Sequence, residues 1–133
     1  MTTKKDYGQH YLVDFVGCDP ETLRFVDPTR EIFLRAARES KATVVGEDFY
    51  QFEPEGVSGV VLIAESHLSV HTWPEDGFAA VDIFTCGVEM EADLAIAVLT
   101  DAFRAKQTIV KVVTRGQLDE SDTEQPDEES DIG

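Results

Sequence analysis

An α+β two-layer sandwich, in which helices cover one face of an antiparallel sheet, is the fold that the sequence predicts. Segments typical of strands and helices follow one another in the order strand, helix, four strands, helix, strand. Turn residues join the middle strands directly, as in an antiparallel sheet. This order does not suit a doubly wound parallel sheet, in which strands and helices alternate.

The first strand and the first helix are recognised by their ends. Tyr11–Val16 has the β-branched and aromatic composition of a strand, and Gly17 ends it. Asp27 is expected to cap a helix whose first residue is Pro28 and which extends to about Lys41. The apolar stripe of this helix consists of Ile32, Phe33, Ala36 and Ala37.

Four strands are predicted in the middle of the chain. β-branched and aromatic residues are frequent there, and two segments that contain Pro and Gly interrupt them. These turn segments are Pro54-Glu55-Gly56 and Pro74-Glu75-Asp76-Gly77. The predicted strands are residues 43–52, 59–65, 66–73 and 78–86.

A second helix and a last strand, at residues 107–113, complete the predicted sandwich. An open sheet of this size leaves an edge or a face uncovered, and a symmetric dimer is one way to protect it. We therefore expect a homodimer. The apolar stripe of the second helix consists of Leu94, Ala95, Val98, Leu99, Ala102 and Phe103.

Charge and length limit the possible partners. The 133 residues include 27 acidic and 11 basic side chains, which give a net charge of −16. Eight of the acidic residues lie in 116–133, a polar segment that is predicted to be a disordered tail. Residues 1–115 are expected to form one domain. Phosphate repulsion argues against nucleic acid as a partner. The charge is explained first by solubility or adaptation to high salt, and second by attraction of a small cationic substrate to the acidic body.

The compartment is predicted from cysteine usage and hydropathy. The chain has two cysteines, and its polar first ten residues do not resemble a signal peptide. The longest uncharged apolar stretch, Val57–Ala64, is far shorter than the roughly 20 residues that span a bilayer. We therefore expect a cytoplasmic protein that does not enter a membrane.

The stretch 65–87 carries most of the reactive side chains. It holds the hydroxyl of Ser66, the imidazoles of His67 and His71, and the thiol of Cys86. Ser66 and His71 are five residues apart, so a regular strand would point them to opposite faces. If these two residues cooperate, the chain must bend or be cut near Ser66.

Three interpretations of these side chains need no known family. A zinc site formed by His67, His71 and Cys86 lacks a clear fourth ligand. A Ser-His hydrolase would be expected to carry Gly-x-Ser-x-Gly, which the sequence does not contain. Thirdly, His71 and Cys86 would be core residues of a binding module.

The same stretch resembles the processing and active-site segment of the prokaryotic S-adenosylmethionine decarboxylases. The resemblance lies in Ala-Glu-Ser-His-Leu-Ser-Val-His-Thr-Trp-Pro-Glu at 64–75 and in Ala-Ala-Val-Asp-Ile-Phe-Thr-Cys-Gly at 79–87. It extends to Phe52, to Gly-Val-Ser-Gly at 56–59 and to Leu-Val-Asp-x-x-Gly-Cys-Asp-Pro at 12–20. A contiguous run of this length is far more specific than a short signature.

The resemblance implies a proenzyme that cuts itself between Glu65 and Ser66. The Ser66 hydroxyl would attack the Glu65 carbonyl carbon, and elimination and hydrolysis would convert Ser66 into a pyruvoyl group that forms a Schiff base with the substrate. The family pattern assigns His71, as proton acceptor, and Ser58 to processing. The products would be two chains, 1–65 and 66–133, held in one fold.

The resemblance also implies roles in the mature enzyme. Cys86 would donate a proton to the carbanion. Phe52 would stack on the nucleoside, and Glu75 would bind ribose hydroxyls. No metal ion would take part in the reaction. The reaction would turn S-adenosylmethionine into the aminopropyl donor for spermidine and polyamine biosynthesis. Two alternatives stay open: a pyruvoyl-dependent arginine or ornithine decarboxylase with the same Ser, His and Cys, and a non-enzymatic regulatory homologue.

Overall fold

A six-stranded antiparallel sheet forms one layer of the protein. The computed structural model describes residues 7–86 and 90–116, and within them the strand order is β2-β3-β4-β5-β1-β6. The antiparallel sheet confirms the predicted fold class. The strands are β1 (Gly8–Val16), β2 (Val44–Gln51), β3 (Val57–Ile63), β4 (Ser66–Trp73), β5 (Phe78–Thr85) and β6 (Gln107–Arg115).

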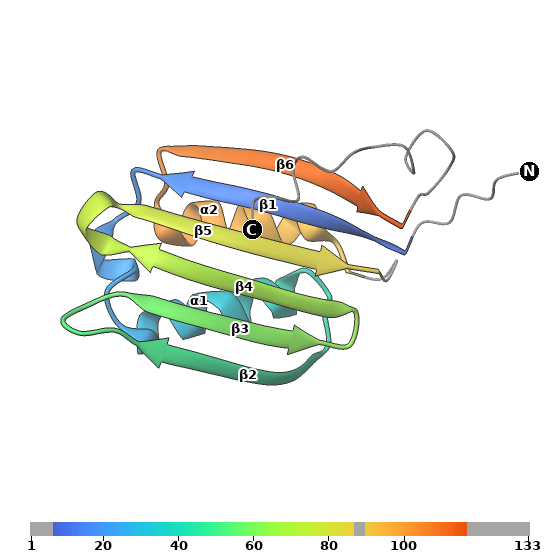
Figure 1. The fold of residues 1–133 in the computed structure, drawn as a ribbon, viewed down its shortest axis with the longest axis horizontal. Coiled ribbons are helices and arrows are strands. Elements are labelled where there is room, and N and C mark those ends of the chain that lie inside the picture. The colour runs from blue at the N-terminus through green and yellow to red at the C-terminus, as the bar shows by residue number, and fades with distance from the viewer. Residues whose placement is uncertain (1–6, 87–89, 117–133) are drawn as a thin grey trace, which may run out of the picture.

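Two helices form the second layer, behind the sheet in Figure 1. They are α1 (Val26–Glu39) and α2 (Ala92–Phe103). Three fully buried aromatic rings join the layers: Phe103 of α2 lies 5.4 Å from Phe15 of β1 and 6.0 Å from Phe33 of α1, measured between ring centroids. Two short 3-10 turns, η1 (Pro20–Thr22) and η2 (Pro74–Asp76), lie between elements.

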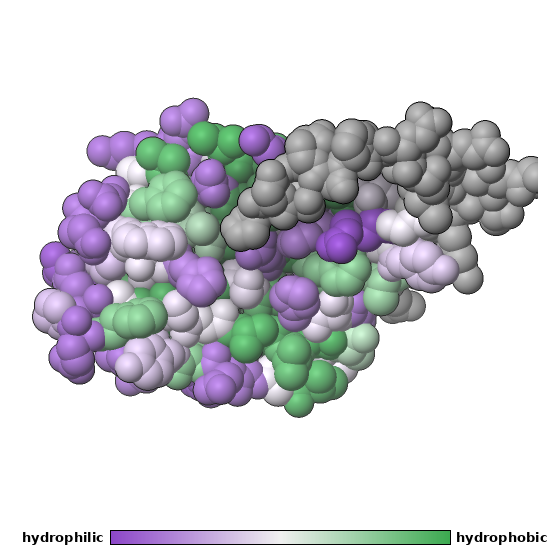
Figure 2. All heavy atoms as spheres, in the orientation of Figure 1, coloured by the Kyte–Doolittle hydropathy of each residue, from purple (hydrophilic) through white to green (hydrophobic). Residues whose placement is uncertain are grey.

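The sheet face opposite the helices, which we call the open face, is not covered by any described residue. On β4, Leu68, Val70 and Thr72 are buried against the helices, so His71 and Trp73 project from the open face. Figure 2 shows this face, on which apolar and polar side chains are interspersed. Its exposed large apolar residues include Leu12, Leu62, Trp73, Ile109 and Val113.

Two details of the predicted helices are wrong. Helix α1 begins at Val26 after Phe25, not after Asp27, and no side chain of its own caps it. The Oε1 atom of Gln51, from β2, accepts the Val26 N–H at 2.8 Å instead. In α2, Leu94 is 41% exposed rather than buried, because the apolar stripe faces α1 and the sheet through its other members.

None of the helices in 7–86 and 90–116 combines the length and apolarity needed to cross a membrane. The predicted disordered tail lies outside the described residues except for Gly116. Both cysteines carry free thiols, with Cys18 buried and Cys86 exposed.

Candidate functional site

The predicted cleavage bond lies in a tight turn between β3 and β4. Ile63 pairs with Ser66 across this hairpin, so that Ala64 and Glu65 alone form its loop. Ser66 opens β4 with φ of +156°, a value that non-glycine residues rarely adopt. The Glu65–Ser66 peptide is therefore held at a point where the strand is not yet regular. We call this loop, with Ser66, the processing turn.

Cys86 supplies two donors to the carbonyl group of that peptide. The backbone N–H of Cys86 donates to the Glu65 carbonyl oxygen at 3.1 Å, and the Cys86 thiol donates to the same oxygen at 3.2 Å. Pairing of Ser66 with Thr85 in the β4–β5 ladder places Cys86 opposite the turn. Two donors on one carbonyl oxygen polarise it and can stabilise an oxyanion.

Ser58 and His71 form a second polar group on the open face. They are direct partners in the β3–β4 ladder, and the Ser58 Oγ shares a hydrogen bond of 2.7 Å with the His71 Nδ1. Gly59 follows Ser58, and the Phe49 ring of β2 occupies the space that a Cβ atom at Gly59 would need. The Trp73 ring lies 6.4 Å from the His71 ring, on the same face.

A cleft of about 250 Å³ opens beside this second group. Two aromatic rings and two carboxylates face it, from the β2–β3 turn and from the end of β4. We call it the β3–β4 cleft. Its lining consists of Phe52, Glu55, Gly56, Ser58, His71, Thr72, Trp73, Pro74 and Glu75.

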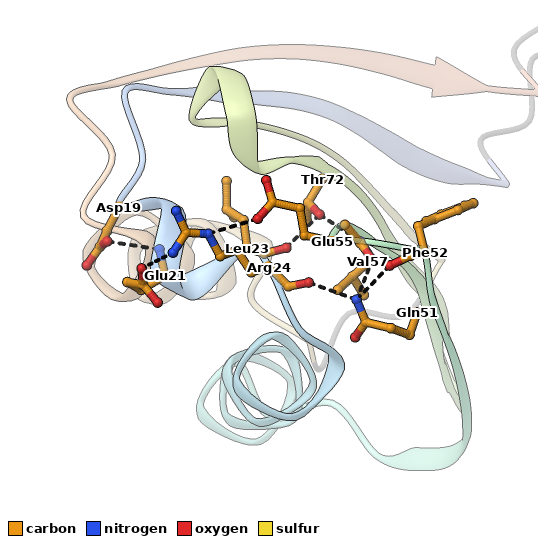
Figure 3. A network of polar contacts seen from close by, with 10 residues as sticks. Asp19, Glu21, Leu23, Arg24, Gln51, Phe52, Glu55, Val57 and Thr72 are labelled. Atoms are coloured by element: carbon orange, nitrogen blue, oxygen red, sulfur yellow. Dashed lines mark hydrogen bonds and ion pairs between the residues drawn. The ribbon is translucent and has the colours of Figure 1, made fainter.

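The side-chain amide of Gln51 anchors the turn that carries Phe52 (Figure 3). Its Nε2 donates to the carbonyl oxygens of Arg24 at 2.9 Å, Phe52 at 3.1 Å and Gly56 at 3.1 Å. Its Oε1 accepts the Val26 N–H that starts α1. One side chain thus ties the β2–β3 turn to the segment before α1.

Thr72 and Arg24 complete this bracing. The buried Thr72 hydroxyl accepts the Val57 N–H at 2.9 Å and donates to the Leu23 carbonyl oxygen at 2.9 Å. Arg24 forms an ion pair with Glu55, with 2.9 Å between Nε and Oε1 but without hydrogen-bond geometry. The wall of the cleft is therefore fixed from behind by residues 23–26, far from it in sequence (Figure 3).

Comparison with known proteins decides the family. Residues 9–116 match the sequence profile of the family described as S-adenosylmethionine decarboxylase. The chain belongs to the S-adenosylmethionine decarboxylase family. The S-adenosylmethionine decarboxylase proenzyme of Thermococcus gammatolerans is 47% identical over 123 residues, which cover 92% of this chain and 86% of that protein.

A bacterial relative and a solved structure agree with this assignment. The S-adenosylmethionine decarboxylase proenzyme of Acidithiobacillus ferrooxidans is 45% identical over 115 residues, which cover 86% of each protein. The crystal structure of the adenosylmethionine decarboxylase from Aquifex aeolicus is similar with a TM-score of 0.80 and 38% identity, over 87% of this chain and 96% of that one. The predicted family and fold are both confirmed.

In this member of the S-adenosylmethionine decarboxylase family, the predicted site residues fall into two groups. Glu65, Ser66 and Cys86 meet at the processing turn, whereas Ser58, His71, Phe52 and Glu75 meet at the β3–β4 cleft. Strand β4 runs without interruption from Ser66 to Trp73. Five residues of extended strand span about 16 Å, so Ser66 and His71 of one chain do not meet.

The sequence pattern did not predict a role in the site for four residues near the cleft: Trp73, Glu55, Gln51 and Thr72. Trp73 lies within the motif at 64–75, and Glu55 directly precedes Gly-Val-Ser-Gly at 56–59. This proximity to the motif is the signal that could have identified the two residues. Nothing in the sequence marks Gln51 or Thr72 as bracing residues, because the partners that tie them to Val57 and to residues 23–26 lie 15 to 49 residues away. Within the described part of the chain, His67, His71 and Cys86 do not form a metal-holding group.

Proposed function

We propose that the protein cuts itself at Glu65–Ser66 to form a pyruvoyl group and then decarboxylates S-adenosylmethionine. The observation that carries this proposal is the Glu65 carbonyl oxygen, which accepts both the N–H and the thiol of Cys86 on the peptide that Ser66 must attack. An amide is an unreactive electrophile, so attack on it needs a positioned nucleophile and a stabilised oxyanion. The two Cys86 donors are suited to stabilise that oxyanion.

Processing would proceed through ester formation, elimination and hydrolysis. The Ser66 Oγ bonds to the Glu65 carbonyl carbon while Cys86 holds the oxyanion, and the C–N bond then breaks to leave an ester. Removal of the Ser66 α-proton breaks the Cβ–Oγ bond, so that Glu65 leaves as a carboxylate. The remaining dehydroalanine becomes an imine, and water releases ammonia to give the ketone. We assign the α-proton to His71, whose hydrogen bond to Ser58 orients the ring.

The cut would not separate the two products, residues 1–65 and 66–133. It falls in a loop of two residues, so every β3–β4 pair from Ser58–His71 to Ile63–Ser66 survives it. Strand β4 also pairs with β5 along its whole length. The fold that surrounds the site is therefore kept after cleavage.

The β3–β4 cleft suits a nucleoside that carries a positive charge. The exposed rings of Phe52 and Trp73 offer stacking surfaces and attract a sulfonium cation, while the Glu75 carboxylate can accept hydrogen bonds from ribose hydroxyls. Glu55 forms an ion pair with Arg24, so Glu75 is the carboxylate that we assign to the substrate. The net negative charge of the chain attracts such a cation to the cleft.

We further propose a homodimer in which each site is built from two copies. The Ser66 and His71 of one chain lie about 16 Å apart along β4, although processing needs both. Two copies that pack their open faces together in antiparallel fashion would bring the processing turn of one chain to the cleft of the other. Exposed apolar side chains on that face would be buried by the same contact.

The pyruvoyl ketone would supply the electron sink for loss of carbon dioxide. Cys86 lies beside the processing turn, where its thiol could return a proton to the substrate Cα. The product would serve as the aminopropyl donor in spermidine synthesis. Two unpaired thiols are consistent with action in the cytoplasm.

The intact mass of the purified, denatured protein tests the proposal first. We expect two fragments divided at Glu65–Ser66, the second lighter by one ammonia than simple hydrolysis would give. Release of carbon dioxide from S-adenosylmethionine, arginine and ornithine then tests the substrate, with Ser66→Ala as the uncut control. Equal turnover of arginine would exclude our substrate assignment, and an uncut wild-type chain would contradict the whole proposal.

A further inference from the structure

We propose that His67 is the base that takes the hydroxyl proton of Ser66 in the first step of processing. The His67 Nδ1 lies 3.4 Å from the Ser66 Oγ. That distance is long for a hydrogen bond, but catalytic contacts in resting structures are often long and tighten as the reaction proceeds. The inference rests on the proposed function and adds a catalytic residue to it.

A separate base is needed because the two processing steps remove different protons. The first step takes the proton on the Ser66 Oγ, and the second takes the proton on its Cα. His71 of the same chain lies about 16 Å away along β4, whereas His67 is already at the hydroxyl before any partner copy arrives. Ester formation could therefore begin within one chain.

The sheet holds the His67 ring in place. His67 stands between Leu62 of β3 and Phe84 of β5 in the strand register, and its ring centroid lies 6.1 Å from that of Phe84. Phe84 is itself contacted by the His10 ring at 5.8 Å and by the Arg115 guanidinium at 5.8 Å. The contact with Phe84 restrains the His67 ring, whose Nδ1 lies beside the Ser66 hydroxyl.

The proposed step needs no reactant beyond the protein itself, because the proton that His67 accepts is returned to the leaving nitrogen. With its own proton on Nε2, the neutral imidazole accepts the Ser66 hydroxyl proton at Nδ1. The Oγ bonds to the Glu65 carbonyl carbon, and the Cys86 N–H and thiol hold the oxyanion. The imidazolium then returns the proton to the Ser66 nitrogen as the C–N bond breaks. The net change is an amide converted into an ester.

The test isolates ester formation by blocking the later elimination with His71→Ala. In that background we compare His67→Asn with His10→Asn, a matched control because His10 packs on the other side of the same Phe84 ring. Neutral hydroxylamine cleaves an ester at Glu65 but leaves an amide intact. The fragments are followed by mass. Because a general base contributes roughly 100-fold or more, we expect His67→Asn to slow ester formation by at least that factor, whereas His10→Asn, which removes only a contact to Phe84, should slow it far less.

Free imidazole distinguishes catalysis from a structural role. In His67→Ala with His71 intact, added imidazole is expected to restore cleavage, since it can occupy the vacated space and accept the proton. Slow ester formation that imidazole does not restore would overturn the proposal, as would an ester that forms at the control rate in His67→Asn. Either result would leave the proposed function intact as long as wild-type protein is cut, whereas an uncut wild type would remove that function itself.

Discussion

The two ends of strand β4 are built in different ways. The processing turn is made from neighbours in one hairpin plus the residue that follows β5, and backbone pairing alone places Cys86 against Glu65. The β3–β4 cleft is assembled from the β2–β3 turn and the end of β4, with the segment before α1 bracing it from behind. Chemistry is thus tied to the sheet, and binding is tied to longer-range contacts.

This difference predicts which amino-acid substitutions each end of β4 should tolerate. Strand register fixes the processing turn, so substitutions behind the cleft should not move the Glu65 carbonyl group. Side chains such as Gln51 and Thr72 fix the cleft, so their loss should affect substrate binding before it affects ester formation at Ser66.

Mixing two inactive variants should restore cleavage if each site combines both ends from different copies. Ser66→Ala cannot form the ester, and His71→Ala cannot complete elimination. In a mixed dimer, the Ser66 of one chain would meet the intact His71 of the other. We expect co-expressed, differently tagged variants to yield cleaved chains of the His71→Ala type only, measured by intact mass. Absence of any cleaved chain in isolated mixed dimers would show that the ends do not combine across copies.

Thr72→Val should weaken the cleft while sparing the processing turn. Valine keeps the shape but leaves the Val57 N–H and the Leu23 carbonyl group without their buried partner. We expect the free energy of unfolding to fall by about 2–4 kcal/mol, measured with urea, and KM to rise several-fold with little change in the rate of ester formation at Ser66.

Thr108→Val is the matched control, because its hydroxyl bonds to Thr100 away from both ends. It should leave KM unchanged. A Thr72→Val protein that binds substrate normally but forms the ester at Ser66 slowly would reverse our assignment of the two ends.

The sequence predicted most of the fold because each element is locally encoded. Strand composition, turns with Pro and Gly and the apolar stripe of α1 gave the correct order of elements. The start of α1 was wrong because its N–H partner, Gln51, comes from β2, 25 residues away. The contiguous motif also gave the reactive residues, and the predicted strand at 66–73 already separated Ser66 from His71. The sequence could not show the strand pairing that places Cys86 against the Glu65 carbonyl group.

The buried thiol of Cys18 should make the stability of the fold depend on pH. Burial raises the pKa of the Cys18 thiol from 9.0 to about 11. The folded state therefore holds this proton more tightly, so its stabilising effect is complete below pH 9 and is lost as the pH rises toward 11. At about 1.4 kcal/mol per pKa unit, wild type should lose about 2–3 kcal/mol more over this range than Cys18→Ala, measured by urea unfolding. Parallel pH profiles would contradict this.

Removal of the acidic tail should have the smallest effect, because a segment so rich in Asp, Glu, Ser and Pro is predicted not to pack against the domain. Truncation after Arg115 keeps β6 complete and removes eight of the net negative charges. Screening limits the reach of those charges to about 8 Å at physiological salt, so cleavage and kcat should be unchanged at moderate salt, and KM for a cationic substrate should rise only when salt is low. An equally large change at high salt would mean that the tail contacts the site directly, and that one of the two ends needs a third element.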